Sequence, residues 1–209
     1  MKNKMYITVF ALALSMFSAN AAVITGVTAT ATSEGGTRTA VHVVDGSGLT
    51  GNQHSSYPHG YMWLSSNTVP ESIVFDLGAV YNVTQLHVWN YNEAGDWAGG
   101  ALVDIGSNAV SVTYGTTLSD FTLGGSTGKV GAITTFAKAT GLATYTGETF
   151  STSFDARYVK FDIASNHGHP AYHNAALSEV QFTGTAVPEP SSVALLGGLG
   201  MFALLRRRR

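Results

Sequence analysis

Five of the seven histidines in the 209-residue sequence fall in two loop-like stretches, which are NQHSSYPHGY (residues 52–61) and NHGHPAYHN (residues 166–174). His167, His169 and His173 are spaced so that two imidazoles could bind one zinc or copper ion. No acidic third ligand stands at a tight spacing beside them. Histidines in polar loops more often make hydrogen bonds at the surface. The pattern therefore favours a polar loop and keeps a transition-metal site as the weaker alternative.

A third stretch, NYNEAGDWAGG (residues 90–100), combines amides, carboxylates and one tryptophan. Small residues surround Trp97 and no strand pattern holds it, so the sequence leaves open whether the ring is an exposed stacking platform or is buried. Glu93 and Asp96 are neighbouring acids in this stretch. A glycosidase needs two carboxyl groups about 5 to 10 Å apart across a cleft. These acids therefore carry an enzymatic alternative.

Composition and missing motifs exclude several chemistries. The sequence has no cysteine, which excludes disulfides, thiolate zinc sites and a cysteine nucleophile. GGSTGKV (residues 124–130) has valine where a phosphate-binding loop needs Ser or Thr, and neither H-E-x-x-H nor G-x-S-x-G occurs. Residues 22–186 hold five basic and twelve acidic residues, a net charge of −7 (5 − 12). Nucleic-acid binding needs a basic footprint, so no nucleic-acid partner is expected, and a divalent cation suits this surface better.

Short alternating segments must position these loops. Apolar and polar residues alternate in five windows, and no window outside the two termini has a helical period. The chain is rich in Gly, Thr, Ser, Val and aromatic residues, which is typical of short strands joined by turns. Trp63 and Trp89 share the strand spacing and are predicted to pack in the core. The sequence therefore predicts an all-β sandwich. The predicted strands lie at 72–78, 83–91, 109–115, 157–165 and 177–184.

The order of motifs along the chain resembles a known domain family. HVVDGSGL, YMWLSS, the FDLG strand end, ARYVKFDI and LSEVQFTG follow one another between Ala29 and Gly184. This order is similar to that of discoidin, or coagulation factor 5/8 type C, domains of the galactose-binding-like superfamily. The resemblance implies an eight-stranded jelly-roll β-sandwich, which we place at residues 22–186.

The resemblance also implies a structural calcium ion. In calcium-binding members, the aspartate of the early D-G turn and the glutamate of the last strand approach each other, together with backbone carbonyls. Mixed carboxylate and carbonyl oxygens suit Ca²⁺. The alternative is that the aspartate only caps its turn and the glutamate lies in solvent on an edge strand. The residues carried over are the side chains of Asp45 and Glu179 and the carbonyls of His42, Ser47 and Ser178.

Members of this family mostly bind ligands without catalysis, and loops at one end of the sandwich hold sugars, glycans or lipid head groups. The resemblance thus implies a non-catalytic carbohydrate-binding domain, with an extracellular polysaccharide of the producing cell as the expected partner. Two alternatives stay open, namely a structural or adhesive protein with protein partners and no sugar site, and a glycoside hydrolase. The residues expected to bind the ligand are Asn92, Asp96, Trp97, His167, His169, Tyr172 and His173.

Residues 1–21 have the pattern of a signal peptide with a helical apolar centre. Lys2 and Lys4 precede an apolar run, and Ala19-Asn20-Ala21 matches the small-x-small pattern before a signal peptidase site. A first buried helix is the weaker alternative. The sequence therefore predicts export across the inner membrane.

Residues 187–209 combine a Pro-Glu-Pro start, a short apolar run at 193–205 and a basic end. As a helix this run rises only about 20 Å, short of the roughly 30 Å hydrocarbon core. The arginines favour a cytoplasmic C-terminus. The run is therefore predicted to be a short transmembrane helix that is removed on maturation, and a plain single-span anchor is the weaker alternative.

The same segment resembles the PEP-CTERM sorting signals of Gram-negative bacteria, which are recognised by an exosortase and associated with exopolysaccharide and biofilm production. The resemblance implies that the chain is held transiently in the inner membrane and delivered to the cell surface or the extracellular matrix. The residues assigned to the signal are Val187, Pro188, Glu189, Pro190, Arg206, Arg207, Arg208 and Arg209.

Overall fold

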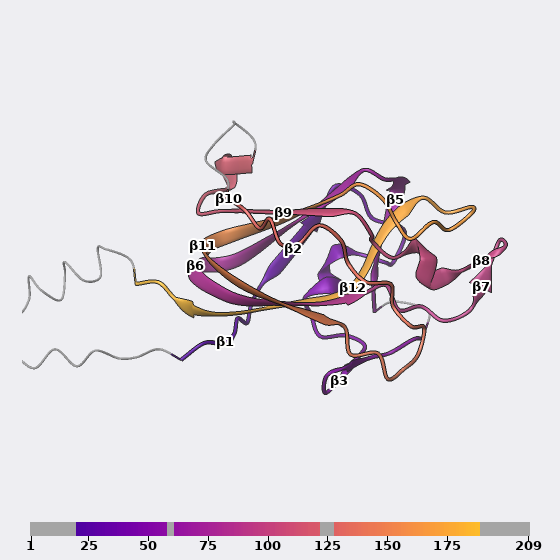
Figure 1. The fold of residues 1–209 in the computed structure, drawn as a ribbon, viewed down its shortest axis with the longest axis horizontal. Coiled ribbons are helices and arrows are strands. Elements are labelled where there is room, and N and C mark those ends of the chain that lie inside the picture. Colours follow the sequence, from indigo (N-terminus) through magenta and orange to yellow (C-terminus); the bar gives the residue numbers. More distant parts are fainter. Residues whose placement is uncertain (1–19, 58–60, 122–127, 189–209) are drawn as a thin grey trace, which may run out of the picture.

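The computed structural model describes residues 20–57, 61–121 and 128–188, which form an antiparallel β-sandwich (Figure 1). The all-β prediction is confirmed. The strands are β1 (Ala22–Val23), β2 (Thr28–Ala31), β3 (Leu49–Thr50), β4 (Gln53–His54), β5 (Trp63–Thr68), β6 (Glu71–Asn90), β7 (Asp96–Trp97), β8 (Gly100–Ala101), β9 (Val110–Gly115), β10 (Gly128–Lys129), β11 (Glu148–Ile163) and β12 (Asn174–Ala186). Three short 3-10 helices complete the described chain, which are η1 (Ala40–Val43), η2 (Leu102–Ile105) and η3 (Leu118–Phe121).

The helices predicted for the two termini lie outside the described residues or almost so. The signal helix at 1–21 is described only at residues 20 and 21, and the span at 193–205 is not described. No helix within the described ranges has the length and apolar character needed to cross a membrane.

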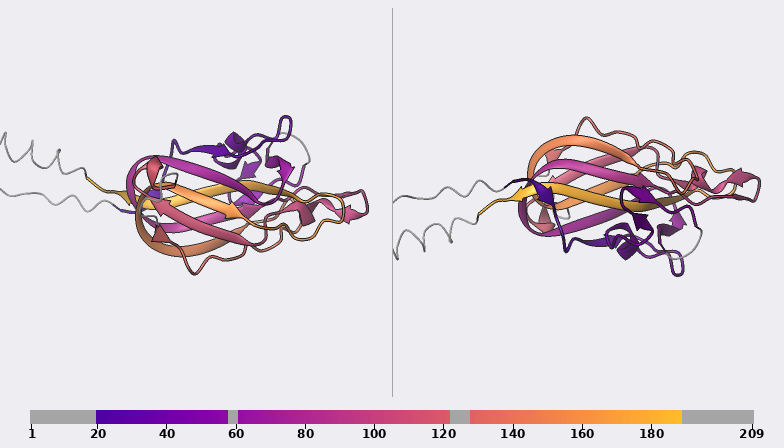
Figure 2. Two further views of the ribbon diagram at one scale, coloured as in Figure 1. Left: turned by 90° about the horizontal axis from the view of Figure 1, so that it is seen from above. Right: turned by 90° about the horizontal axis from the view of Figure 1, so that it is seen from below.

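Eight strands join one hydrogen-bonded sheet in the order β1-β12-β6-β11-β9-β10, with β2 beside β6 and β5 beside β12. The β3–β4 and β7–β8 pairs are separate two-stranded hairpins. The views from above and below show that the sheet closes over itself, with the β7–β8 hairpin at one end (Figure 2). We call that end the loop pole.

Two long strands bend and belong to both layers of the sandwich. β6 buries Ile73 and Phe75 in alternation until Gly78, whose φ of +83° breaks the pattern. Its first half pairs with β2 and with the end of β11, whereas its second half pairs with β12 and the start of β11. The register of β11 shifts between Ala156 and Tyr158, near this bend. The first layer therefore consists of β2, the first half of β6, the end of β11, β9 and β10.

The core lies between the two layers. Phe75 is fully buried, and its ring meets Phe161 at 4.9 Å and Phe182 at 5.2 Å, centroid to centroid, in edge-to-face contacts. Trp63 and Trp89 are buried too, as their strand spacing predicted. The alternating apolar residues thus build the core.

Replacing Phe75 by alanine is expected to lower the free energy of unfolding by about 3–5 kcal/mol, because the change leaves a cavity where three rings meet. Urea unfolding followed by tryptophan fluorescence measures the loss. Phe75→Leu is the control and should cost less, since it keeps most of the buried volume. Equal stability of Phe75→Ala and the parent chain would contradict this account of the core.

Candidate functional site

A pocket of about 340 Å³ opens at the loop pole. Its size falls at the lower end of the range for small-ligand sites, which combine apolar walls with a few placed polar groups. Four separate parts of the chain contribute to it, so it exists only in the folded domain. The lining residues are Arg38, Leu64, Tyr91, Glu93, Asp96, Trp97, Leu102, Ile105 and Tyr172.

The β7–β8 hairpin presents Trp97 at the mouth of this pocket. Asp96 pairs with Ala101 and Trp97 with Gly100, so the turn between the strands has two residues. Both turn residues have positive φ, including Ala98 at 49°, as a type I′ hairpin requires. The Trp97 side chain is 63% exposed, so its flat face is open to a ligand.

Tyr172 holds the indole from the other side of the pocket. Trp97 Nε1 donates a hydrogen bond to Tyr172 Oη over 2.7 Å. A bond through the ring edge leaves the aromatic face free for stacking. The pair thus joins the 90–100 and 166–174 stretches in the lining of one pocket.

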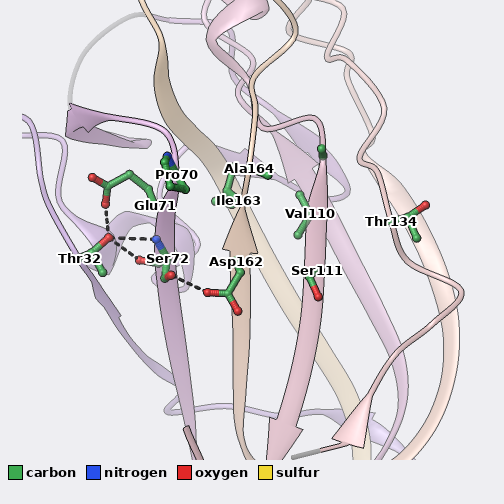
Figure 3. A pocket seen from close by; sticks show the side chains of 11 residues that line it. Thr32, Pro70, Glu71, Ser72, Val110, Ser111, Thr134, Asp162, Ile163 and Ala164 are labelled. Atoms are coloured by element: carbon green, nitrogen blue, oxygen red, sulfur yellow. Dashed lines mark hydrogen bonds between the residues drawn. The ribbon is translucent and has the colours of Figure 1, made fainter. Parts of the chain in front are cut away.

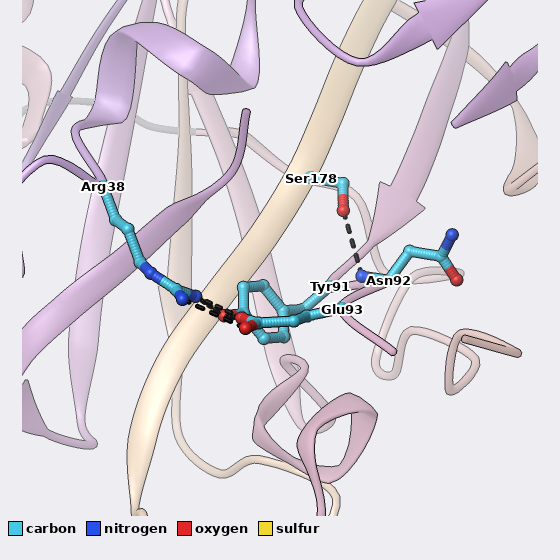
Figure 4. A network of polar contacts seen from close by, with 5 residues as sticks. All are labelled: Arg38, Tyr91, Asn92, Glu93 and Ser178. Carbon is cyan, nitrogen blue, oxygen red and sulfur yellow. Dashed lines mark hydrogen bonds and ion pairs between the residues drawn. The ribbon is translucent and has the colours of Figure 1, made fainter. Parts of the chain in front are cut away.

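A partly buried polar network around Arg38 includes three of the residues that line the pocket, which are Arg38, Tyr91 and Glu93 (Figure 4). Arg38 donates from Nη2 to Glu93 Oε1 over 3.1 Å, and from Nη1 to Glu93 Oε2 and to Tyr91 Oη. Tyr91 and Glu93 are almost completely buried. A guanidinium has five N–H donors, so Arg38 keeps further donors for the pocket that it lines. The network therefore presents a fixed, preoriented cation beside the exposed indole.

Sequence reasoning missed Arg38 and Tyr91. Arg38 stands 55 residues before Glu93 in the sequence, in a Gly/Thr-rich stretch with no motif. Tyr91 continues the apolar pattern of β6 and looks like a core residue. The one available signal was rarity, because Arg38 is one of only five basic residues between 22 and 186.

Asn92, which the sequence predicted to bind ligand, is fully buried and connects loops instead. Its side-chain amide donates to the carbonyls of His54 and Leu142 and accepts from the N–H of Gly141 over 2.9 Å. Its backbone N–H donates to Ser178 Oγ (Figure 4). The structure thus places Asn92 behind the pocket wall and outside the candidate site.

The three loop histidines do not gather around one point. His169 is fully buried, and its Nδ1 accepts the backbone N–H groups of Ala171 and Tyr172, so it shapes the loop that carries Tyr172. His167 is half-buried, and burial lowers its pKa. His173 is exposed. Within residues 20–57, 61–121 and 128–188, no group of three or more His, Asp or Glu side chains could hold a metal ion.

Asp45 and Glu179 approach each other around the Gly46 turn. Glu179 is buried on β12, which lies between β1 and β6 and is not an edge strand. Gly46 N donates to Glu179 Oε2 over 3.2 Å, and Ser47 N donates to Asp45 Oδ1 over 2.8 Å. His42 Nδ1 lies 3.1 Å from Asp45 Oδ2. The alternative of a solvent-exposed Glu179 on an edge strand is therefore wrong, whereas Asp45 does cap its turn.

The electrostatics around Glu179 suit a cation. Burial, together with the charge of Asp45, raises the pKa of the Glu179 carboxyl to about 8. A buried carboxylate is costly unless a positive charge compensates it. Asp45 lies on the turn and Glu179 is bonded to the N–H of Gly46 in it, and carboxylate oxygens are hard donors of the kind that Ca²⁺ prefers. The residues at this site thus fit the calcium ion that the sequence resemblance implied.

A larger cavity, of about 560 Å³, lies on the first layer (Figure 3). Hydroxyl and carboxylate groups line it in pairs, with Ser72 Oγ donating to Asp162 Oδ1 over 2.7 Å and Thr32 Oγ1 donating to Glu71. None of the described residues around it is aromatic. Because it lacks a flat apolar face, it is a poorer candidate for sugar binding than the smaller pocket at the loop pole.

The glycine at position 100 permits the close approach of the hairpin to the 166–174 stretch. A Cβ at Gly100 would lie 3.1 Å from His169 Cδ2 and still closer to Pro170 Cδ. Gly100→Ala is therefore expected to push the hairpin outward and to weaken ligand retention several-fold, with little change in the unfolding midpoint. Affinity electrophoresis measures the first and thermal unfolding the second. Gly131→Ala, which has open space at its Cβ, is the matched control.

Residues 186–209 match the PEP-CTERM protein-sorting motif, which confirms the sequence-based identification of this segment. The motif implies export and processing by an exosortase. Of the assigned signal residues, Val187 and Pro188 are described, and Glu189, Pro190 and Arg206 to Arg209 lie outside the described residues.

Several solved structures share the fold, whereas no curated protein matches the chain in sequence. The family 32 carbohydrate-binding module of C. perfringens NanJ, solved with galactose, has a TM-score of 0.50 and 17% identity over 78% of this chain and 99% of the module. CBM32-3 from a family 31 glycoside hydrolase of Clostridium perfringens has a TM-score of 0.51 and 16% identity, over 76% of this chain and 91% of that chain. A fucolectin from striped bass (Morone saxatilis) serum has a TM-score of 0.56 and 18% identity, over 78% of this chain and 48% of the fucolectin chain.

Identities below 20% establish a common fold and nothing further. The fold is that of CBM32 and discoidin-like, galactose-binding-like modules, as the order of sequence motifs predicted. The chain spans only about half of the fucolectin chain.

Proposed function

We propose that this chain is an exported, non-catalytic protein whose β-sandwich binds carbohydrate in the pocket at the loop pole. One observation carries the proposal: exposed Trp97 and the partly buried Arg38–Glu93 pair line a single pocket. The indole would cover the C–H face of a sugar ring, and the spare N–H groups of Arg38 and the carboxylate of Asp96 would bond its hydroxyls. The fold shared with a galactose-bound module supports this assignment.

The same pocket offers less to a hydrolase. Glu93 and Asp96 both line it, but the oxygens of Glu93 already accept bonds from Arg38 and Tyr91. A glycosidase needs one carboxyl as general acid and a second as base or nucleophile. Glu93 acts instead as the group that orients Arg38, which favours binding over catalysis.

A structural or adhesive role with no sugar site predicts that the loop aromatics scatter over the surface. Asp96, Trp97 and Tyr172 instead line one concavity. Their convergence supports a ligand site. An adhesive role would then mean that the protein adheres, through this site, to a surface that presents the glycan.

We propose further that Asp45 and Glu179 hold a structural Ca²⁺ ion, with carbonyls of His42, Ser47 and Ser178 as the expected additional ligands. When bound, the ion would neutralise the two carboxylates and tie the Gly46 turn to β12. The raised pKa of Glu179 and the Gly46 contact support this site.

Delivery completes the proposal. Residues 1–21 would direct export, and residues 187–209 would hold the chain briefly in the inner membrane of a Gram-negative cell until an exosortase releases it to the surface or matrix. The matched motif supports the second half of this route.

A glycan array probed with the full chain in detergent tests the carbohydrate assignment. We expect retention on a restricted set of glycans, galactose-terminated ones among them, and competition by the free sugar. Uniform absence of binding across neutral and acidic glycans, with a folded protein, would contradict the proposal.

A further inference from the structure

The ligand pocket and the sorting motif lie at opposite ends of one strand. Tyr172 lines the pocket and stands two residues before β12, which runs from Asn174 to Ala186. The matched motif begins at residue 186, where β12 ends. At about 3.3 Å per residue, the 13 residues of β12 separate the two by roughly 40 Å.

β1 and the end of β12 lie at the end of the sandwich opposite the β7–β8 hairpin, as Figure 1 and Figure 2 show. β1 pairs with β12, with Ala22 opposite Gly184. Val187 N donates to Val80 O over 2.9 Å, so the first residues of the sorting motif are bonded to the bend of β6. We call this end, made of residues 21–26, 78–81 and 183–188, the tether pole.

The three segments of the tether pole carry no charged side chain. They contain no Asp, Glu, Lys or Arg, whereas residues 22–186 carry a net charge of −7. Beside them, Asp155 of β11 lies opposite Asn82, and Arg157 pairs with Asp76. Val23 and Val187 are exposed there. An anionic membrane surface repels an acidic body more strongly than it repels an end with few charged side chains. The tether pole is therefore an end of the domain that a bilayer repels little.

We infer that the membrane-held chain stands with its tether pole on the bilayer and its loop pole outward, so that the site takes glycans presented from outside and not glycolipids of the membrane that holds it. The inference rests on the proposed sugar site and on the sorting motif. Only residues 189–192 separate the tether pole from the apolar run at 193–205, and the five steps from residue 188 to residue 193 reach at most about 18 Å. So short a connection keeps the tether pole near the membrane and the pocket roughly 40 Å farther away.

The absence of cysteine from the sequence allows this orientation to be measured cleanly. Ala98→Cys places a donor dye at the tip of the β7–β8 hairpin, and Ala79→Cys places it on the bend of β6. The full chain is reconstituted in vesicles that contain anionic lipid and an acceptor-labelled lipid. We expect energy transfer to be several-fold weaker from the dye at position 98 than from the dye at position 79. Equal transfer from the two positions would overturn the inference.

A second arm compares a galactosyl lipid in the same vesicles with the same lipid in separate vesicles. We expect the protein to bridge its own vesicles to separate vesicles that carry the galactosyl lipid. Outward presentation is supported if this bridging persists when the protein's own vesicles also contain the lipid. If the protein instead binds the lipid of its own vesicles and bridging is lost, the inference is overturned. If neither lipid is bound, the proposed galactose recognition fails, and the dye measurement alone decides the orientation.

Discussion

Replacing Trp97 by alanine is expected to weaken retention on a galactose-bearing polymer about 30-fold, while the unfolding midpoint stays within a degree or two of the parent. A central aromatic contact contributes about 2 kcal/mol to binding, which is roughly 30-fold in affinity. The side chain is 63% exposed and outside the core, so its loss removes a binding surface and leaves the packing intact. Affinity electrophoresis in polymer-containing gels measures the change.

Two variants sharpen this test. Tyr57→Ala removes another aromatic side chain, 64% exposed, that does not line the pocket, and it should retain parental affinity. Trp97→Phe keeps a flat ring but loses the bond from Nε1 to Tyr172, so it should fall between the parent and the alanine variant. If Trp97→Ala and Tyr57→Ala bind alike, the pocket at the loop pole is not the sugar site.

Calcium is expected to raise the melting temperature by roughly 5–10 °C, and a chelator should reverse the gain. A ligand bound only by the folded state at 100 times its dissociation constant adds about 2.7 kcal/mol, which for a domain of this size corresponds to several degrees. Differential scanning calorimetry with calcium or with EGTA measures the shift. A melting temperature that responds to neither would exclude Asp45 and Glu179 as metal ligands.

The calcium effect should be larger at pH 8 than at pH 5, and Glu179 is the reason. Without a cation, its folded pKa of about 8 lies above the ordinary value of 4.5. The folded state then binds the proton more tightly than the unfolded state, so stability is greatest at low pH and falls as the pH rises through this interval. Calcium competes with that proton and removes the loss at high pH.

Glu179→Gln separates the two contributions. Without calcium at pH 8 the variant should be at least as stable as the parent, because it no longer has to ionise a buried carboxyl. It should also lose the response to calcium. Asp76→Asn is the control, since Asp76 pairs with Arg157 in another part of the sandwich and its loss should leave the calcium response unchanged.

Much of the fold could be predicted from residue alternation, although the strand count along the chain could not. The segments 72–78 and 83–91 each have a clear two-residue period, which predicts two separate strands. The structure joins them in the single strand β6, because β11 pairs with both halves across the bend at Gly78. Local periodicity contains no information about a partner strand some 70 residues further along the chain.

Only part of the candidate site could be predicted from the sequence. Trp97 and Tyr172 stood out because each lies in a loop with polar neighbours. Arg38 did not stand out, because its place in the pocket depends on its hydrogen bonds to Glu93 and Tyr91. Both residues are more than 50 positions away in the sequence. His169 resembles Tyr172 in its setting, yet its Nδ1 is occupied by backbone N–H groups of its own loop.

The sequence by itself determined the class of fold, the acidic character of the domain and the sorting segment at its C-terminus, because each depends on composition or on spacing along a short stretch. The tertiary structure decided which loops meet, which polar side chains are already satisfied, and that the pocket and the sorting segment lie at opposite poles. These properties arise from strand pairings between distant segments, such as β1 with β12 and β6 with β11. Long-range pairing selects among many loops of similar composition, and only the folded chain brings Arg38 and Trp97 to the same pocket.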